Sequence, residues 1–191
     1  MPRISAATVA DHRASQHAAL LEAAMEILVA EGPGALTPAA VGAKVGLARS
    51  SVYRYFSSTA GILAQLVEEA IPRWAGRLRA VSTGDGTLEE RVRAFGAATL
   101  EFVRSPDHVL LRTLASVELP AECQERVDQL HETMIEPLRD MAAEAGHAQP
   151  DLVAHLAWSV LGEGQRRLAA GGPSEVVTPT TLDVLCRAII N

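Results

Sequence analysis

Residues 36–56 read LTPAAVGAKVGLARSSVYRYF, and this stretch decides how the N-terminal part of the chain folds. Val41 and Val45 lie four residues apart, which places them on one face of a short helix. Gly46 follows where the chain must turn, because glycine adopts a positive φ at little cost. A second short helix is expected over residues 49–55. The stretch therefore predicts a helix-turn-helix.

The second of these helices is polar and rich in aromatic residues. Its six notable side chains are Arg49, Ser50, Ser51, Tyr53, Arg54 and Tyr55. A helix this short buries too little surface to stabilise itself, so its composition indicates that it is presented to a partner. An arginine can donate two hydrogen bonds to guanine O6 and N7. We therefore predict that Arg49, at the helix start, reads guanine and that Arg54, at its end, contacts phosphate.

The charge of the chain is distributed unevenly. The 191 residues are 48% hydrophobic, with a mean hydropathy of +0.13 and a formal net charge of −6. This balance argues against a histone-like protein that coats nucleic acid. Residues 1–59 carry five basic and four acidic side chains, whereas the remainder carries twelve and nineteen. The asymmetry indicates a small DNA-facing head on an acidic body.

The rest of the chain shows helical periodicity, interrupted by Gly and Pro, and no convincing alternating strand. After a tail over residues 1–12, helices are expected at about residues 13–31, 38–45, 49–55, 60–81, 88–104, 107–119, 120–145 and 149–170. A ninth helix is expected to start at a cap on Thr178 or Thr181. Thr37 is the predicted cap of the second helix, Thr87 with Glu90 forms a predicted capping box, and Pro72 is expected to kink or end the fourth helix.

The sequence gives no sign of a metal site or a membrane segment. Cys123 and Cys186 are far apart, with no Cys or His at metal-ligand spacing, and reduced thiols in a cytoplasmic protein are expected. No secretory signal and no run of about 20 apolar residues is present. We expect no cofactor and no membrane association.

The layout resembles the tetracycline-repressor-like (TetR) family of bacterial regulators. The residues that fall where the family pattern expects such types are Ala24, Leu28, Gly32, Leu36, Thr37, Val41, Gly46, Leu47, Tyr53, Tyr55 and Phe56. Their spacing, from Gly32 through Thr37 and Gly46 to Phe56, matches the family without a gap. The resemblance implies an all-α fold: a three-helix DNA-binding head with a helix-turn-helix, followed by a bundle of about six helices.

The same resemblance implies a homodimer that binds palindromic double-stranded operator DNA and is released by a small effector. Residues 13–58 would bind DNA, and residues 59–191 would bind ligand and dimerise. The implied DNA contacts are Thr37 and Lys44 to phosphate, Arg49, Ser50 and Ser51 to base edges, and Tyr53 and Tyr55 to the backbone, with Arg54 added from its position. We expect a repressor with a hydrophobic or amphipathic effector.

Three positions depart from the family pattern. Thr59 stands where the family usually has Lys, which removes a charge but keeps a capping hydroxyl. Ala48 replaces a usual Ser or Thr N-cap, worth about 1 kcal/mol. Gly42 replaces a usual alanine, at a cost of about 1 kcal/mol in helix propensity. These departures motivate an alternative: a non-enzymatic ligand-binding or protein-interaction bundle with weak or lost DNA binding.

Apolar stripes give candidates for the other two roles. The predicted dimer interface on the last two helices contains Leu152, Leu156, Trp158, Val160, Leu182, Leu185 and Ile189. The candidate ligand contacts are Trp74, Phe95, Thr99, Phe102, Thr113, His131 and Met134. Each ligand candidate also fits a core position; for Thr99 we favour a hydroxyl bonded to a backbone carbonyl one turn back.

Enzyme functions find little support in the sequence. It contains no His-Glu-x-x-His zinc motif, no phosphate-cradling glycine loop and no nucleophile elbow. A helical enzyme with a dispersed site is the third interpretation. We therefore expect a non-enzymatic protein.

Overall fold

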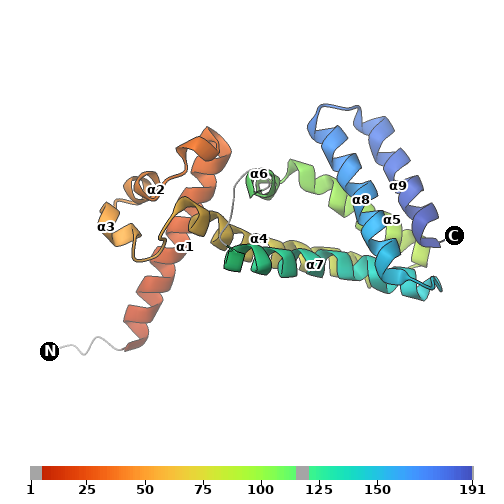
Figure 1. Cartoon of the computed structure of the whole chain (residues 1–191), viewed down its shortest axis with the longest axis horizontal. Helices are drawn as coiled ribbons and strands as arrows, with labels where there is room; N and C mark the ends of the chain where they lie inside the picture. The colour runs from red at the N-terminus through yellow and green to blue at the C-terminus, as the bar shows by residue number, and fades with distance from the viewer. Residues whose placement is uncertain (1–5, 115–120, 191) are drawn as a thin grey trace. The chain divides into compact units, whose positions relative to one another are not determined.

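The computed structural model describes residues 6–114 and 121–190, and over these ranges the chain is all-α, as predicted (Figure 1). The described residues contain no strand. Their α-helices are α1 (Ala6–Glu31), α2 (Pro38–Lys44), α3 (Arg49–Val52), α4 (Thr59–Ser82), α5 (Leu88–Glu101), α6 (Pro106–Leu114), α7 (Ala121–Glu144), α8 (Pro150–Ala169) and α9 (Ser174–Ile190). Two 3-10 helices accompany them, η1 (Pro33–Ala35) and η2 (Phe102–Arg104).

The chain divides into two compact units, which are described separately. The N-terminal unit consists of residues up to Glu68 together with Val109–Gln124. The C-terminal unit consists of Glu69–His108 and Glu125 onward. Helices α4, α6 and α7 contribute residues to both units.

The core of the N-terminal unit is built from the apolar face of α1 and from single anchors on the short helices. Leu20 and Leu28 of α1, Val41 of α2 and Val52 of α3 are all fully buried. Val52 is the one buried residue of α3, so the other three residues of this helix remain at least partly accessible. Burial of one side chain fixes the helix and leaves its polar side chains available to a partner.

Gly42 explains how α2 and α3 approach each other so closely. A Cβ added at Gly42 would lie 2.5 Å from Val52 Cγ2 and 3.0 Å from the carbonyl oxygen of Leu47. An alanine at this position would therefore force the two helices apart. Gly42 lowers the helix propensity of α2 but allows α2 and α3 to pack closely. The sequence alone did not reveal this packing.

Several predicted helix ends are confirmed. Thr37 caps α2 by accepting a hydrogen bond from the backbone N–H of Ala40 at 3.1 Å. Gly46 adopts a φ of +71° in the turn after α2. Thr87 and Glu90 form the predicted capping box at the start of α5.

Other predicted helix boundaries were wrong. Helix α1 starts at Ala6, so residues 6–12 are helical and not a tail. Helix α3 ends at Val52, because the N–H groups of Arg54 and Tyr55 bond to carbonyls three residues back, which tightens the chain into a turn. Helix α4 continues through Pro72, so of the two expected effects of this proline, a kink or an end, the end is excluded. The predicted junction between the sixth and seventh helices, at residues 119 and 120, lies outside the described residues.

The start of α9 was also misplaced. The helix begins at Ser174, so Thr178 and Thr181 lie inside it and cap nothing. The buried hydroxyl of Thr181 donates to the carbonyl oxygen of Val177 at 2.7 Å, one turn back. The N–H groups of Val176 and Val177 bond to the carbonyl oxygen of Pro173, which starts the helix without a threonine cap.

The sequence offers Ser57, Ser58 and Thr59 as caps for α4, and the hydroxyl of Thr59 does not serve as one. It donates to the carbonyl oxygen of Leu36 at 3.0 Å and so ties the start of α4 to the segment before α2. The residue before it, Ser58, accepts from the N–H of Gly61 at 3.0 Å and is the cap.

The C-terminal unit is organised around α5, α8 and α9, which pack side by side (Figure 1). Glycines allow the close contacts: a Cβ at Gly96 of α5 would lie 2.6 Å from side-chain atoms of Leu182 and Leu185 of α9. A Cβ at Gly164 of α8 would lie 2.8 Å from the hydroxyl of Thr181. The glycine of α8 therefore serves packing inside the protomer.

Two kinds of site were sought across the described residues. No described helix has both the length and the apolar character needed to cross a membrane. No group of three or more His, Cys, Asp or Glu side chains in residues 6–114 and 121–190 is arranged to hold a metal ion. Cys186 is a free, buried thiol, and the side chain of Cys123 lies outside the description.

Candidate nucleic-acid interface

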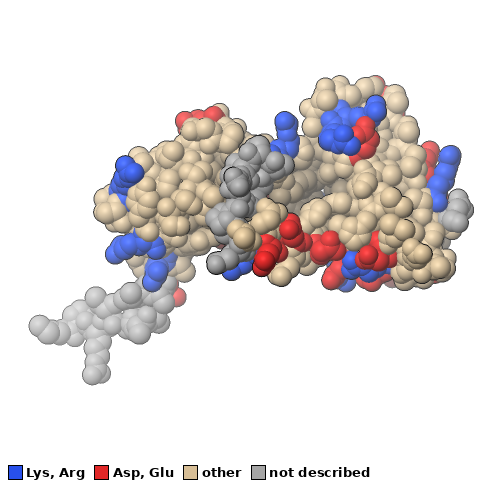
Figure 2. All heavy atoms as spheres, viewed as in Figure 1, with Lys and Arg blue, Asp and Glu red and all other residues tan. Residues whose placement is uncertain are grey.

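The side chains predicted to bind DNA are all accessible in the N-terminal unit. Six of them are exposed: Thr37, Lys44, Arg49, Ser50, Tyr53 and Arg54. Ser51 and Tyr55 are half-buried. In the view of Figure 2, the blue Lys and Arg atoms of this unit gather around α3, at the left-hand end of the molecule. The structure therefore brings the predicted side chains of α2, α3 and the following turn onto an accessible, basic surface.

Arg49 and Tyr53 form a pair one turn apart. The Nη2 atom of Arg49 donates to the Tyr53 hydroxyl oxygen at 3.1 Å, and the guanidinium carbon lies 5.4 Å from the centre of the ring. Both are exposed, and Tyr53 retains 44% of its accessible surface. A guanidinium has five N–H donors, so most remain available to a base edge or a phosphate. The tyrosine orients the arginine without using up its hydrogen-bonding capacity.

Lys44 and Thr37 each have a partner inside the unit. The Nζ atom of Lys44 lies 3.0 Å from a carboxylate oxygen of Glu26, in an exposed ion pair. Such pairs contribute at most about 1 kcal/mol, so a phosphate can compete for the lysine. The Thr37 hydroxyl accepts from the N–H of Ala40, which leaves its own proton free to donate.

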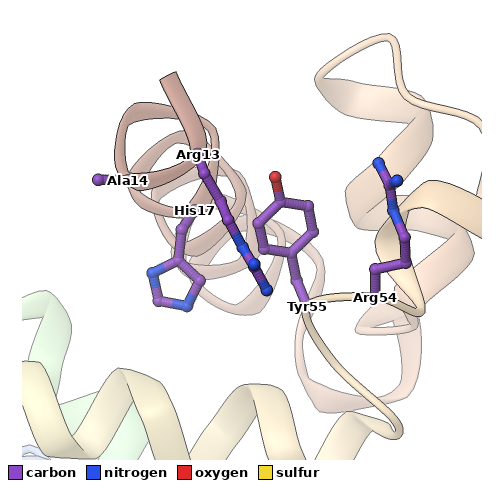
Figure 3. A pocket seen from close by; sticks show the side chains of 5 residues that line it. All are labelled: Arg13, Ala14, His17, Arg54 and Tyr55. Atoms are coloured by element: carbon purple, nitrogen blue, oxygen red, sulfur yellow. The ribbon is translucent and has the colours of Figure 1, made fainter. Parts of the chain in front are cut away.

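Three α1 residues that the sequence did not single out for this site lie near Tyr55, and Figure 3 shows two of them, Arg13 and His17. The Tyr55 hydroxyl donates to Gln16 Oε1 at 3.0 Å, and the guanidinium carbon of Arg13 lies 5.9 Å from the centre of the Tyr55 ring. The His17 ring lies 6.1 Å from the same ring. Arg13 and His17 are four residues apart, so the sequence could have predicted that they share one face of the helix. Only the tertiary structure shows that this face lies next to Tyr55.

A cleft of about 440 Å³ opens beside Tyr55. The residues that line it are Arg13, Ala14, His17, Arg54 and Tyr55. Two of these carry a positive charge and none is acidic. The cleft therefore favours an anion.

Residues 20–66 match the family of bacterial regulatory proteins named tetR. This stretch of the N-terminal unit is therefore similar to the TetR family, in agreement with the resemblance seen in the sequence. The matched residues cover the buried face of α1, all of α2 and α3, and the first turns of α4.

Solved structures share the fold across nearly the whole chain. A TetR-family transcriptional regulator from Streptomyces coelicolor has a TM-score of 0.74 at 19% identity, covering 91% of this chain and 95% of its own. The regulator FadR from Bacillus subtilis, solved in complex with stearoyl-CoA, has a TM-score of 0.73 at 15% identity, covering 91% and 99%. A protein described as the superantigen PfiT has a TM-score of 0.73 at 22% identity, covering 90% and 94%.

At these sequence identities the structural similarity establishes a shared fold, and function has to be inferred from the residues of the site. A comparison with curated protein sequences finds no match.

The predicted ligand contacts are mostly core residues. Trp74, Phe95, Thr99, Phe102, Thr113 and Met134 are buried. The Trp74 indole N–H donates to Asp107 Oδ2 at 3.0 Å, and its ring meets Phe102 edge-on at 4.4 Å. The hydroxyl of Thr99 donates to the carbonyl oxygen of Phe95 at 2.8 Å, as favoured from the sequence. Thr113 does the same toward Val109 at 2.9 Å, within the N-terminal unit.

His131 also has an internal partner. Its Nε2 atom accepts a hydrogen bond from the indole N–H of Trp158 at 3.1 Å. Burial lowers the pKa of His131, while the nearby Glu132 and Asp128 carboxylates oppose this shift. The contact also places Trp158 of α8 against α7 of its own protomer.

The residues predicted for the dimer interface fall into two groups, one accessible at the surface of the protomer and one buried inside it. On α8, Leu152 and Leu156 are 52% and 58% exposed, and Val160 is half-buried. On α9, however, Leu185 and Ile189 are fully buried inside the protomer.

Leu182 is half-buried beside Gly96 of α5, so it too faces the protomer. The exposed large apolar residues of α9 include Val176 and Val184, at 56% and 43%, and Ile190, at 36%. The sequence prediction did not include Val176, which it placed before the helix, or Val184, which it placed in the helix but not on its apolar face. We call Leu152, Leu156, Val160, Val176 and Val184 the α8–α9 apolar face.

Proposed function

We propose that this protein is a ligand-responsive transcriptional repressor of the TetR family that binds a palindromic operator as a homodimer and is released by a small effector. The observation that carries the proposal is α3: one buried anchor, Val52, holds a helix whose Arg49 and Ser50 are exposed on a basic surface. In this proposal residues 13–58 bind DNA, residues 59–191 bind effector and dimerise, and the protein acts in the cytoplasm without catalysing a reaction.

The proposed DNA contacts follow from the position of α3. A major groove about 12 Å wide admits one helix. Arg49, oriented by Tyr53, would reach a guanine edge, and the short side chains of Ser50 and Ser51 would allow the helix to approach the bases closely. Thr37, Lys44, Tyr53, Arg54 and Tyr55 would hold phosphates on either side and set the register.

A dimer is proposed because the C-terminal unit leaves a continuous set of apolar side chains uncovered. The α8 members Leu152, Leu156 and Val160 repeat every fourth residue, which places them on one face of the helix. A second copy bringing the same face would bury both sets by an isologous contact. Two-fold pairing also presents two copies of α3 to half-sites about one helical turn, roughly 34–36 Å, apart.

The effector is proposed to be hydrophobic or amphipathic. The interior of the C-terminal unit offers mostly apolar side chains with a few polar groups, such as Thr99 and His131. The structural similarity to FadR, which was solved with stearoyl-CoA, supports this class of molecule. We retain Trp74, Phe95, Thr99, Phe102, His131 and Met134, all of the C-terminal unit, as proposed contacts. The effector would act by favouring a protomer geometry in which both α3 helices no longer fit the operator.

Selection from a pool of random DNA duplexes tests the proposal without knowledge of the operator. The wild-type protein should enrich a two-fold symmetric consensus with half-site centres a whole number of helical turns apart, and binding to it should weaken steeply with salt. The Arg49→Ala variant should lose the preference at one base position in each half-site. If no sequence is enriched and binding at low salt is absent, the alternative of a helical bundle that has lost DNA binding is correct.

A further inference from the structure

We propose that Arg13 of α1 and Arg54, after α3, form a clamp for one DNA backbone phosphate, with the Tyr55 ring as the platform between them. The clamp extends the contact with DNA beyond the helix-turn-helix to the first helix. This inference rests on the proposed DNA-binding function and adds a contact that the sequence pattern did not identify.

The two arginines reach the same place from distant parts of the chain. Figure 3 shows them on opposite sides of the Tyr55 ring, Arg13 coming from α1 and Arg54 from the segment after α3. Both are exposed, and within the described part of the chain neither forms an ion pair. The 440 Å³ cleft that they share has no acidic lining residue. Two unneutralised guanidinium groups at one open cleft match the charge and geometry of a phosphate.

Tyr55 is held so firmly that it acts as a support. Its hydroxyl proton is donated to Gln16, the guanidinium carbon of Arg13 lies 5.9 Å from the centre of its ring, and the His17 ring lies 6.1 Å from that ring. The His17 ring in turn lies 5.5 Å from that of Phe56, which is buried, and its Nε2 atom lies 2.5 Å from Oε1 of Gln65 on α4. The Tyr55 ring is therefore fixed beside Arg13, and in the clamp the positive charge that meets the phosphate comes from the guanidinium groups of Arg13 and Arg54.

The clamp explains why α1 extends to Ala6. Arg13 lies seven residues after the first residue of α1, so its backbone is fixed by helix on both sides. A side chain on a fixed backbone loses less conformational freedom when it binds than one on a tail. The helical start therefore preorganises Arg13 for a phosphate.

The test compares arginine variants on the duplex obtained by selection. The slope of log Kd against log salt concentration should fall by about one for each phosphate contact removed. Arg13→Gln should lower the slope by about one per protomer and weaken binding to operator and random duplexes by the same factor. Arg112→Gln, which removes an exposed arginine from α6 of the same unit, should leave the slope unchanged.

Neutral methylphosphonate linkages then locate the contact. The wild-type protein should lose affinity when one particular phosphate of each half-site is neutralised, and Arg13→Gln should be insensitive to that same replacement. Arg13→Lys should retain the slope but bind more weakly, because a lysine cannot form the bidentate contact.

The outcomes separate the two proposals. A wild-type protein that binds no duplex overturns the proposed function and the clamp with it. A wild-type protein that binds, combined with an Arg13→Gln variant that keeps the full slope and the same sensitivity to methylphosphonate, overturns the clamp alone. A lower melting temperature of Arg13→Gln with an unchanged slope would show that Arg13 only packs against Tyr55.

Discussion

The surface around α3 and the α8–α9 apolar face are both exposed, but their chemistry is opposite. The first presents arginines, hydroxyls and a tyrosine, and the second presents leucines and valines. Charged side chains stay solvated until a charged partner replaces the water, whereas apolar side chains gain free energy only when they are covered. The surface around α3 therefore suits a charged partner that binds reversibly and depends on salt, whereas the α8–α9 apolar face suits a partner that keeps it covered.

Leu156→Glu, which places a charge on the α8–α9 apolar face, should have the largest effect, and that effect is on dimer stability. Burying a leucine contributes about 2 kcal/mol, and a symmetric dimer buries two copies of each, so the dimer should be weakened on the order of 10³-fold. Sedimentation at micromolar concentration should show a monomer with unchanged helix content. Arg166→Glu, a change of charge at an exposed α8 position, is the control. A dimeric Leu156→Glu variant would remove the α8–α9 apolar face from the proposal.

Arg49→Ala tests whether the surface around α3 reads a base. A bidentate arginine–guanine contact discriminates by roughly 1–3 kcal/mol, so the variant should lose about 10- to 100-fold in affinity per half-site at one base position. Binding of both proteins to a set of single-base operator variants measures this. A uniform loss at every base would mean that Arg49 contacts the backbone and does not read a base.

Gly42→Ala tests whether the surface around α3 depends on close packing beneath it. Its Cβ would meet Val52 Cγ2 at 2.5 Å, and such overpacking costs about 1–3 kcal/mol in the free energy of unfolding. Gly76→Ala, at a helical glycine with open space around it, should be neutral or slightly stabilising. The double variant Gly42→Ala with Val52→Ala should be less destabilised than the sum of the single variants, as measured by chemical denaturation. Strict additivity would contradict the packing argument.

The smallest expected effect concerns the pH dependence of the C-terminal unit. Burial lowers the pKa of His131, so its contribution to stability is fully present above the ordinary histidine pKa of about 6.5 and is lost as the pH falls toward the lowered value. Protonation at Nε2 would also break the hydrogen bond from Trp158. The indole N–H resonance of Trp158, identified by its loss in Trp158→Phe, should shift with a midpoint below 6.5. The shift should vanish in His131→Gln, and a midpoint above 6.5 would contradict the effect of burial.

The sequence predicted the N-terminal unit in more functional detail than the C-terminal unit. Around α3, roles follow from local spacing: Thr37 before a proline-led helix, Gly46 at a turn, and polar residues on a helix too short to be core. In the C-terminal unit the helices were predicted but not their facing surfaces. The start of α9 depends on hydrogen bonds to the Pro173 carbonyl, which no threonine marks. Packing within the protomer buries Leu185 and Ile189, which had been assigned to a surface, and leaves Val176 and Val184 exposed.

Contacts between distant segments were the other information that the sequence lacked. Nothing in the local pattern connects Gln16 with Tyr55, or Gly42 with Val52, because each pair is brought together only by tertiary packing. The predicted ligand contacts show the same limit. Periodicity placed Phe95 and Met134 on apolar faces, but it does not distinguish a side chain that fills the core from one that lines a binding site.

The most direct test links the two surfaces by comparing the affinity of the wild-type protein and Leu156→Glu for a duplex with two half-sites and for a duplex with one. If dimerisation through the α8–α9 apolar face positions two copies of α3, the wild-type protein should bind the two-site duplex far more tightly, and Leu156→Glu should bind both duplexes with the same weak affinity per half-site. A Leu156→Glu variant that keeps the full preference for two half-sites, or a wild-type protein without that preference, would contradict the account.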